Sequence, residues 1–95
     1  MTTALIPGSF DPITLGHLNI IRRAAQIFDK VVVCVMKNSA KTYMFTTAER
    51  VELVERVTAR LINIEVATTD MLLAEFAKQF DGAVIAKGLR AVSDF

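Results

Sequence analysis

Four short apolar runs divide this 95-residue chain and constrain its fold more than any other feature. Each run is continuous and rich in β-branched residues, as is typical of strands that are buried on both faces of a sheet. The runs are Ala4 to Ile6, Val31 to Met36, Ile62 to Ala67 and Ala83 to Ala86. The sequence therefore predicts four strands with substantial connections between them.

Each connection carries apolar residues at the three-to-four-residue spacing of an amphipathic helix. The three stripes are Leu18, Ile21, Ala25 and Phe28, then Val51, Val54, Val57 and Leu61, then Leu73, Phe76, Ala77 and Phe80. Capping residues precede each stripe: Thr14, the capping-box pair Thr46 and Glu49, and Asp70. The predicted order is β-α-β-α-β-α-β.

This alternation predicts an α/β fold, a Rossmann-like doubly wound parallel sheet with right-handed crossovers and helices on both faces. In that arrangement the first strand is central, the second and third lie on one side, and the fourth lies on the other. Ligands bind at the carboxyl ends of the strands where the order reverses. Residues 7–13 and 87–93 should flank this point.

Composition narrows the class of partner. Eleven basic and ten acidic residues give a net charge of +1, which argues against a nucleic-acid-binding surface. No apolar stretch approaches the roughly 20 residues that span a bilayer, and the N-terminus lacks the pattern of a signal peptide. We expect a cytoplasmic protein without a membrane partner. The only cysteine, Cys34, lies in an apolar run, so we interpret it as a buried, inert thiol.

The loop after the first predicted strand concentrates polar groups suited to a phosphate. Gly8 permits a turn or close approach of a ligand, and Ser9 offers a hydroxyl and a backbone N–H. Thr14 and His17 share one face of the first helical turn, where the helix N-terminus favours an anion. Gly16 leaves room for a flat ligand. We interpret His17 as a donor to charge on a phosphoryl oxygen; alternatively, it only fills an early-helix turn.

The motifs in this loop and two later segments resemble known families. Thr14-Leu15-Gly16-His17, preceded by Gly8-Ser9-Phe10-Asp11-Pro12, resembles the T/H-x-G-H signature of the nucleotidyltransferase superfamily. That signature does not choose between adenylyl and cytidylyl transfer. Two later segments resemble the bacterial phosphopantetheine adenylyltransferases. They are Met44-Phe45-Thr46-x-x-Glu49-Arg50 and Lys87-Gly88-Leu89-Arg90-x-x-x-Asp94-Phe95. The resemblance extends along the whole chain.

This resemblance implies adenylyl transfer from ATP to 4′-phosphopantetheine, giving dephospho-coenzyme A and pyrophosphate, with His17 as the catalytic residue. The implied ATP-binding residues are Ser9, Phe10, His17, Gly88, Leu89 and Arg90. The implied acceptor-binding residues are Ser9, Lys41, Leu73 and Lys87. Mg²⁺ is expected because the leaving pyrophosphate is highly charged, but no residue is assigned as a metal ligand. The resemblance also implies a homohexamer, and a nucleotidyltransferase domain over residues 1–95 that is truncated on its C-terminal side.

Several of these residues have a plainer interpretation. Lys41 by itself is typical of a solvated surface lysine, and Leu73 of a helix core. Asp11 either holds its loop through local N–H groups, which we favour, or helps to organise a metal. Arg50 is structural or lies at a subunit contact. Lys87 stands where many family members carry Arg, which keeps the charge but loses the planar fork.

Two rival functions remain at this stage. The first is another transferase of the superfamily, acting on a nicotinamide nucleotide or on a sugar or polyol phosphate. The context of Lys41 and of residues 88–90 argues against it. The second is a non-catalytic nucleotide-binding module, and the combination of Thr14, His17 and Lys41 argues against that.

Overall fold

A computed structural model describes residues 2–37, 42–70 and 84–85 of the chain. The elements follow one another as β1 (Thr3–Gly8), α1 (Leu15–Ile27), β2 (Lys30–Met36), α2 (Thr47–Val57), β3 (Ile64–Thr69) and β4 (Val84–Ile85). Strands and helices alternate as the sequence predicts. The third predicted helix lies outside the described residues.

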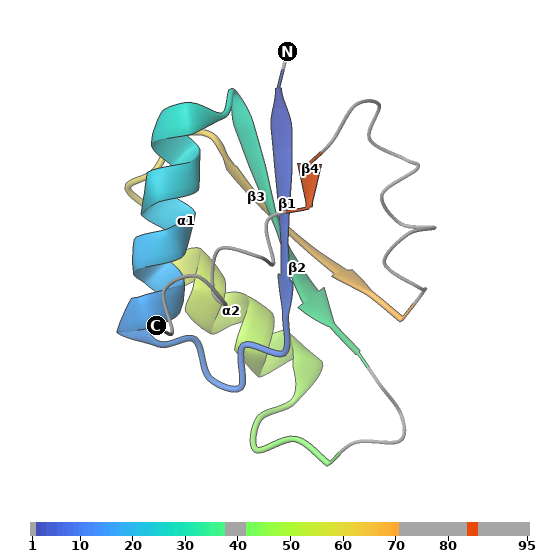
Figure 1. Ribbon diagram of the computed structural model, residues 1–95. Helices are drawn as coiled ribbons and strands as arrows, with labels where there is room; N and C mark the ends of the chain where they lie inside the picture. The colour runs from blue at the N-terminus through green and yellow to red at the C-terminus, as the bar shows by residue number, and fades with distance from the viewer. Residues whose placement is uncertain (1, 38–41, 71–83, 86–95) are drawn as a thin grey trace.

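The four strands form one parallel sheet in the order β3-β2-β1-β4, which is the predicted order. β1 pairs with β2 along its whole length, from Thr3 opposite Lys30 to Gly8 opposite Val35. On its other side, Leu5 of β1 lies opposite Ile85 of β4. The strand order therefore reverses between β1 and β4, and the carboxyl ends of the longer strands lie towards the bottom of Figure 1.

Both described helices cover the same face of the sheet (Figure 1). Ile21 and Ala24 of α1 and Val54 of α2 are buried there in one cluster with alternate residues of β1 and β2. The opposite face carries a second buried cluster, formed by Leu5, Val32 and Cys34. Within the described part of the chain, no helix is both long and apolar enough to cross a membrane.

The predicted helix starts are confirmed for both described helices. The Thr14 hydroxyl accepts the His17 backbone N–H at 3.2 Å, and the Thr46 hydroxyl accepts the Glu49 N–H at 3.1 Å. In return, the Glu49 carboxylate accepts the Thr46 N–H at 2.9 Å. Each helix therefore begins with two of its unpaired N–H groups satisfied by side chains.

The predicted start of the third strand was wrong by two residues. β3 begins at Ile64, and Ile62 is fully exposed. The chain turns first, with the Leu61 N–H donating to the Thr58 carbonyl. Leu61, predicted as the last residue of the second helical stripe, lies beyond the end of α2 at Val57 but still packs against the core. The Asn63 side chain then donates to the carbonyls of Ala25 and Phe28 at 2.9 and 3.1 Å, so its amide fixes this connection to the end of α1.

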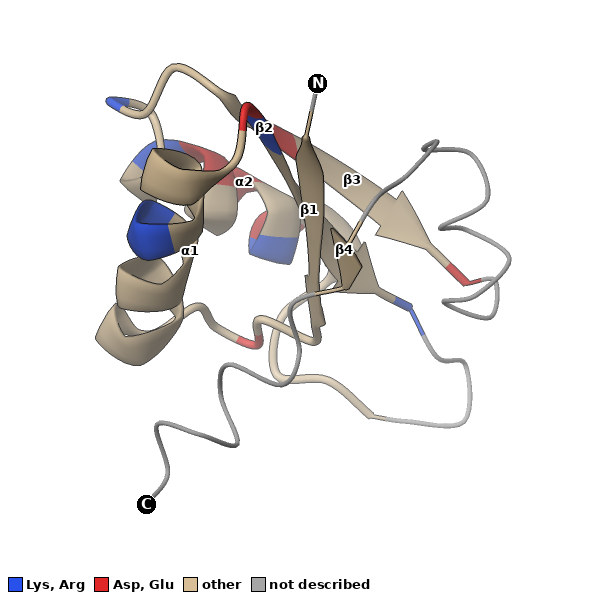
Figure 2. Ribbon diagram, turned by 45° about the horizontal axis from the view of Figure 1, so that its top comes forward, with Lys and Arg blue, Asp and Glu red and all other residues tan. Residues whose placement is uncertain are grey.

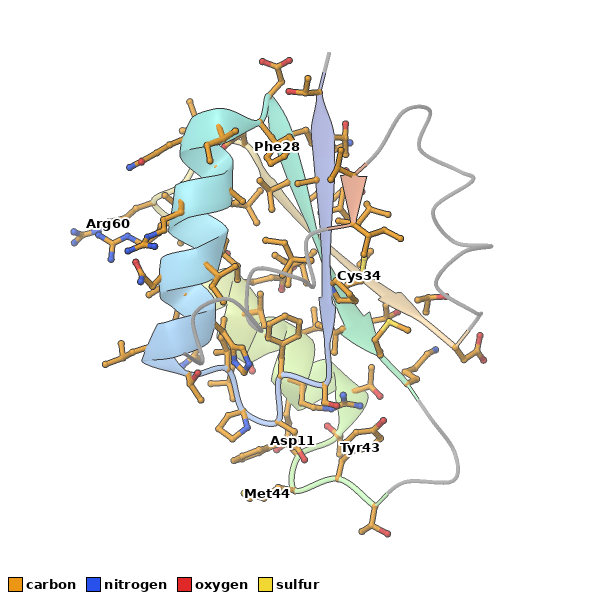
Figure 3. All side chains as sticks on the ribbon, in the orientation of Figure 1. Asp11, Phe28, Cys34, Tyr43, Met44 and Arg60 are labelled. Carbon is orange, nitrogen blue, oxygen red and sulfur yellow. The ribbon has the colours of Figure 1, made fainter. Side chains whose placement is uncertain are left out.

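The single cysteine lies in the middle of the sheet, as Figure 3 shows. Its side chain is fully buried, and its thiol lies 3.8 Å from the Val32 carbonyl. Burial, and secondarily the nearby charge of Glu65, raises the pKa of the Cys34 thiol to about 11. The thiol is therefore protonated at neutral pH, in agreement with the interpretation from sequence.

We expect Cys34 to react with a thiol reagent at least about a thousandfold more slowly in the native protein than in urea, because reaction requires the folded sheet to open.

The raised pKa of Cys34 also predicts an effect of pH on stability. Since an unfolded thiol ionises near pH 8.5 and the folded one near 11, the free energy of unfolding should fall as pH rises through that interval. Urea titrations at several pH values measure this fall, with Cys34→Ala as the matched control that should lack it. Rapid native labelling would contradict the burial.

Candidate functional site

The segment between β1 and α1 lies at the carboxyl edge of the sheet and is held against the segment that precedes α2. The Asp11 carboxylate accepts the backbone N–H groups of Met44 and Phe45 at 2.6 and 2.8 Å. Figure 3 shows Asp11 beside Tyr43 and Met44 at the lower end of the molecule. Asp11 therefore holds its loop in place by accepting N–H groups, as favoured from the sequence. The N–H groups come from residues distant in sequence rather than from the loop itself.

Phe10 has an unusual backbone conformation at the centre of this loop. Its φ is 49°, in the left-handed region that costs a non-glycine residue roughly 1–2 kcal/mol. Its ring is nonetheless buried, and it packs on Gly8, where a Cβ atom would lie 3.1 Å from the ring. Gly8 was predicted to permit a turn or the close approach of a ligand. In the structure the Phe10 ring makes a close approach to Gly8, and the approach of a ligand stays a prediction.

His17 is oriented by the residue that begins its helix. The Thr14 backbone N–H donates to His17 Nδ1 at 3.1 Å, and the Thr14 hydroxyl lies 3.2 Å from the same nitrogen. Because a backbone N–H can only donate, Nδ1 is the acceptor and the neutral ring carries its proton on Nε2. The ring also meets Phe10 edge to face, with 5.0 Å between centroids. His17 thus presents a defined N–H donor.

Gly16, between Thr14 and His17, is exposed in the first turn of α1. Among the described residues, a Cβ atom built on it would meet only the Thr14 hydroxyl, at an ordinary contact distance of 3.7 Å. This part of the chain therefore does not require glycine here. A ligand that lies against the backbone remains the predicted reason for this residue.

Arg50, on α2, joins the two neighbouring strands beneath the loop. Its Nη1 donates to the carbonyls of Ser9 and Met36 at 2.8 and 3.0 Å, and its Nη2 donates to the Thr47 hydroxyl at 3.1 Å. The guanidinium also stacks 3.9 Å above the Tyr43 ring. The structural interpretation of Arg50 is confirmed. Sequence reasoning missed its contact with the candidate site, although its position four residues before Val54 places it on the buried face of α2.

The structure brings together part of the predicted site. Ser9, Phe10 and His17 lie on one loop and helix start at the carboxyl edge of the sheet, and Ser9 is half-buried. The other predicted residues lie outside the described part of the chain: Lys41, Leu73, Lys87, Gly88, Leu89 and Arg90. The described part holds no group of three or more His, Cys, Asp or Glu residues able to bind a metal ion.

The charges of the described residues are spread over the molecule. Figure 2 shows Lys and Arg on α1, α2 and the connecting segments, with acidic residues among them. Two ion pairs form at the surface of the described part of the chain, Lys30 with Glu65 at 2.8 Å and Arg56 with Glu52 at 3.2 Å. Neither involves the loop that carries Ser9 or the first turn of α1, which carries His17.

Solved structures with the same fold include two bacterial or archaeal proteins of low sequence identity. One is described as the lipopolysaccharide core biosynthesis protein from Thermoplasma volcanium. It has a TM-score of 0.72 and 19% identity, over 90% of this chain and 72% of that one. The other is a putative nicotinate-nucleotide adenylyltransferase from Vibrio parahaemolyticus. It has a TM-score of 0.66 and 20% identity, over 99% of this chain and 63% of that one. These similarities establish the Rossmann-like α/β fold.

Sequence relatives are much closer. Proteins named phosphopantetheine adenylyltransferase from Clostridium beijerinckii and Rubrobacter xylanophilus are 53% and 54% identical over all 95 residues. The chain spans 60% and 58% of their respective lengths. The predicted resemblance to this group is therefore confirmed.

The family model described as cytidylyltransferase-like matches residues 5–95, which include the loop, His17 and all the described elements after the first two residues of β1. The chain belongs to the cytidylyltransferase-like family.

Proposed function

We propose that the protein, at its full natural length, transfers AMP from ATP to 4′-phosphopantetheine and releases pyrophosphate. The observation that carries the proposal is the orientation of His17, whose Nδ1 accepts the Thr14 N–H and whose Nε2 therefore bears a proton. The choice of substrates is supported by relatives named phosphopantetheine adenylyltransferase, which are more than 50% identical along the whole chain.

The reaction requires no covalent intermediate with the protein. The acceptor phosphate is already anionic, so it attacks the α-phosphorus of ATP in line, and the bond from that phosphorus to the pyrophosphate oxygen breaks. Catalysis then rests on positioning and on stabilising the charge of the transferring group. His17 Nε2–H would donate to an oxygen of the pentacoordinate α-phosphoryl group. Ser9 and Phe10 would bind phosphate oxygens through a hydroxyl and backbone N–H groups.

The remaining contacts of the proposal follow the family resemblance. Lys41, Leu73 and Lys87 would hold the acceptor. Residues 88–90 would hold the nucleotide. The homohexamer that the resemblance implies belongs to the same proposal, as does the cytoplasmic location expected from the sequence.

Mg²⁺ is part of the proposal as a companion of the nucleotide. Both oxygens of Asp11 already accept N–H groups from Met44 and Phe45. The described residues do not form a protein cage for the ion. Because Mg²⁺ commonly binds through substrate phosphates with few protein ligands, we infer that it arrives with ATP.

We expect His17→Ala to lower kcat by roughly two to four orders of magnitude, or about 3–5 kcal/mol of transition-state stabilisation. The affinity for ATP should change far less, because the donor acts on charge that develops during transfer. Pyrophosphate release and equilibrium ATP binding measure the two effects at full natural length. His17→Gln, which keeps an N–H donor, should recover part of kcat. Normal turnover at saturation with lost ATP binding would assign His17 to ground-state binding instead.

A substrate panel tests the reaction itself. The wild-type protein should use ATP in preference to CTP, and phosphopantetheine in preference to nicotinamide mononucleotide or polyol phosphates. Use of another pair would support the alternative transferase, and nucleotide binding without turnover would support a non-catalytic module.

Gly16→Ala should separate ligand binding from stability. Since a Cβ atom fits in the protein at this position, and alanine is a better helix residue than glycine by up to about 1 kcal/mol, the variant should be at least as stable as wild type. If ATP lies against the Gly16 backbone, its KM should rise at least about tenfold, equivalent to about 1.4 kcal/mol. Asn19→Ala, at an exposed position of the same helix, is the matched control. An unchanged KM for ATP in Gly16→Ala would mean that ATP does not lie against the Gly16 backbone.

A further inference from the structure

Arg50 is a buried cation whose contacts converge on the candidate site. Only 1% of its surface is exposed, and it is the largest fully buried side chain among the described residues. One nitrogen, Nη1, binds the carbonyl of Ser9 at the end of β1 and the carbonyl of Met36 at the end of β2. The guanidinium therefore fixes the positions of two adjacent strand ends relative to each other.

The bond to Ser9 also sets the direction of the next N–H group. The Ser9–Phe10 peptide is trans, since the only cis peptide in the described ranges joins Asp11 to Pro12. In a planar trans peptide the C=O and N–H point in opposite directions. Because the Ser9 carbonyl points at Arg50, the Phe10 N–H points away from it. Among residues 2–37, 42–70 and 84–85, none accepts a hydrogen bond from this N–H, so its direction is set by the bond from Arg50 to the Ser9 carbonyl.

The effect of Arg50 extends to His17 through the Phe10 ring. Phe10 is held in a left-handed conformation with its ring between Gly8 and His17. A strained backbone persists only where the surroundings fix it on both sides. Arg50 fixes the Ser9 side of Phe10, and the N–H groups of Met44 and Phe45 fix Asp11 on the other side.

The charge of Arg50 is unusual for so buried a position. No carboxylate within the described ranges forms an ion pair with it, and its Nε has no hydrogen-bond partner. Burying a cation without a counter-ion is costly. Its retention directly beneath the loop is understandable if an anion binds on the other side of that loop.

We propose that Arg50 is a positioning residue for nucleotidyl transfer. It orients the Ser9–Phe10 peptide and, through the Phe10 ring, the His17 imidazole, without touching either substrate. This inference rests on the proposed function, because it concerns the residues that act in that reaction.

The test compares Arg50→Lys and Arg50→Met with wild type at full natural length. Lysine keeps the charge but cannot reproduce the planar fork that binds two carbonyls and a hydroxyl. Because small displacements of catalytic groups are costly, we expect both variants to lose kcat by about 10- to 100-fold, with a change in the KM for ATP of less than about threefold. Full rescue of kcat by lysine would overturn the proposal, because charge alone would then suffice.

Asn63→Ala is the matched structural control. Asn63 also donates to two carbonyls, those of Ala25 and Phe28, and so links elements much as Arg50 does. Figure 3 shows Phe28 at the end of the sheet opposite Asp11. Assayed well below its melting temperature, Asn63→Ala should keep kcat within about twofold of wild type, because only stability is affected. If Asn63→Ala lost as much kcat as Arg50→Lys, Arg50 would act only through stability.

Thr47→Val keeps the test informative if the Arg50 variants do not fold. It leaves Arg50 in place and removes only the acceptor of Nη2. We expect it to lower kcat in the same direction by about threefold, because a loosened guanidinium orients the loop less well. Unchanged kcat in Thr47→Val, with Arg50→Lys also unfolded, would count against positioning.

One measurement does not depend on turnover and separates this inference from the proposed function. The proposed function is tested by AMP transfer in the wild-type protein, without any variant. In nuclear magnetic resonance spectra, Arg50→Lys should shift the Phe10 amide and the His17 ring signals and should speed hydrogen exchange at Met44 and Phe45. Asn63→Ala should leave these signals and exchange rates unchanged. Undisturbed signals in Arg50→Lys would overturn the positioning role even in a protein that transfers AMP, and disturbed ones would support it even if the substrates were different.

Discussion

The parallel pairing of β1 with β2 is the constraint on which the rest of the structure depends. The two strands are in register from Thr3 opposite Lys30 to Gly8 opposite Val35, so they end at the same level of the sheet. Both faces of this pair are buried, which leaves little freedom to slip, because a shift by one residue would exchange the faces of every side chain. Only with the strand ends level can a single guanidinium nitrogen reach the carbonyls of both Ser9 and Met36.

The order of elements could be predicted from the sequence because it depends on local signals. Continuous β-branched runs marked the strands, and Thr14 and Thr46 marked the helix starts through hydrogen bonds to residues only three positions away. The strand order followed from general rules of connection in parallel sheets. The error at Ile62 has the same origin, since an apolar residue beside a turn resembles a strand residue until the position of Leu61 in the core is known.

The contacts that shape the candidate site could not be predicted in the same way. Asp11 binds N–H groups more than thirty residues away, and Arg50 binds a carbonyl 41 residues before it. Almost every residue has a backbone N–H and a carbonyl, so these groups give no sequence signal. When a side chain binds one of them, the sequence does not show which residue supplies the partner. The motif indicated where the site lies, but not what holds it. The left-handed conformation of Phe10 was equally hidden, because Gly8 two residues earlier is the more obvious candidate for an unusual backbone.

The start of α1 shows why the signature residues are difficult to assign to folding or to chemistry alone. Thr14 caps the helix by accepting the His17 N–H, and its own N–H returns to His17 Nδ1. The second bond satisfies a backbone donor, as the acid of an ordinary capping box does, and at the same time it fixes the tautomer of the imidazole. A glutamate in place of His17 could complete the cap equally well but would offer no N–H. Helix capping therefore explains a polar acceptor three residues after Thr14, and the contact with the Phe10 ring suits an aromatic side chain at that position. The proposed transfer would in addition use the second, donating nitrogen of the imidazole.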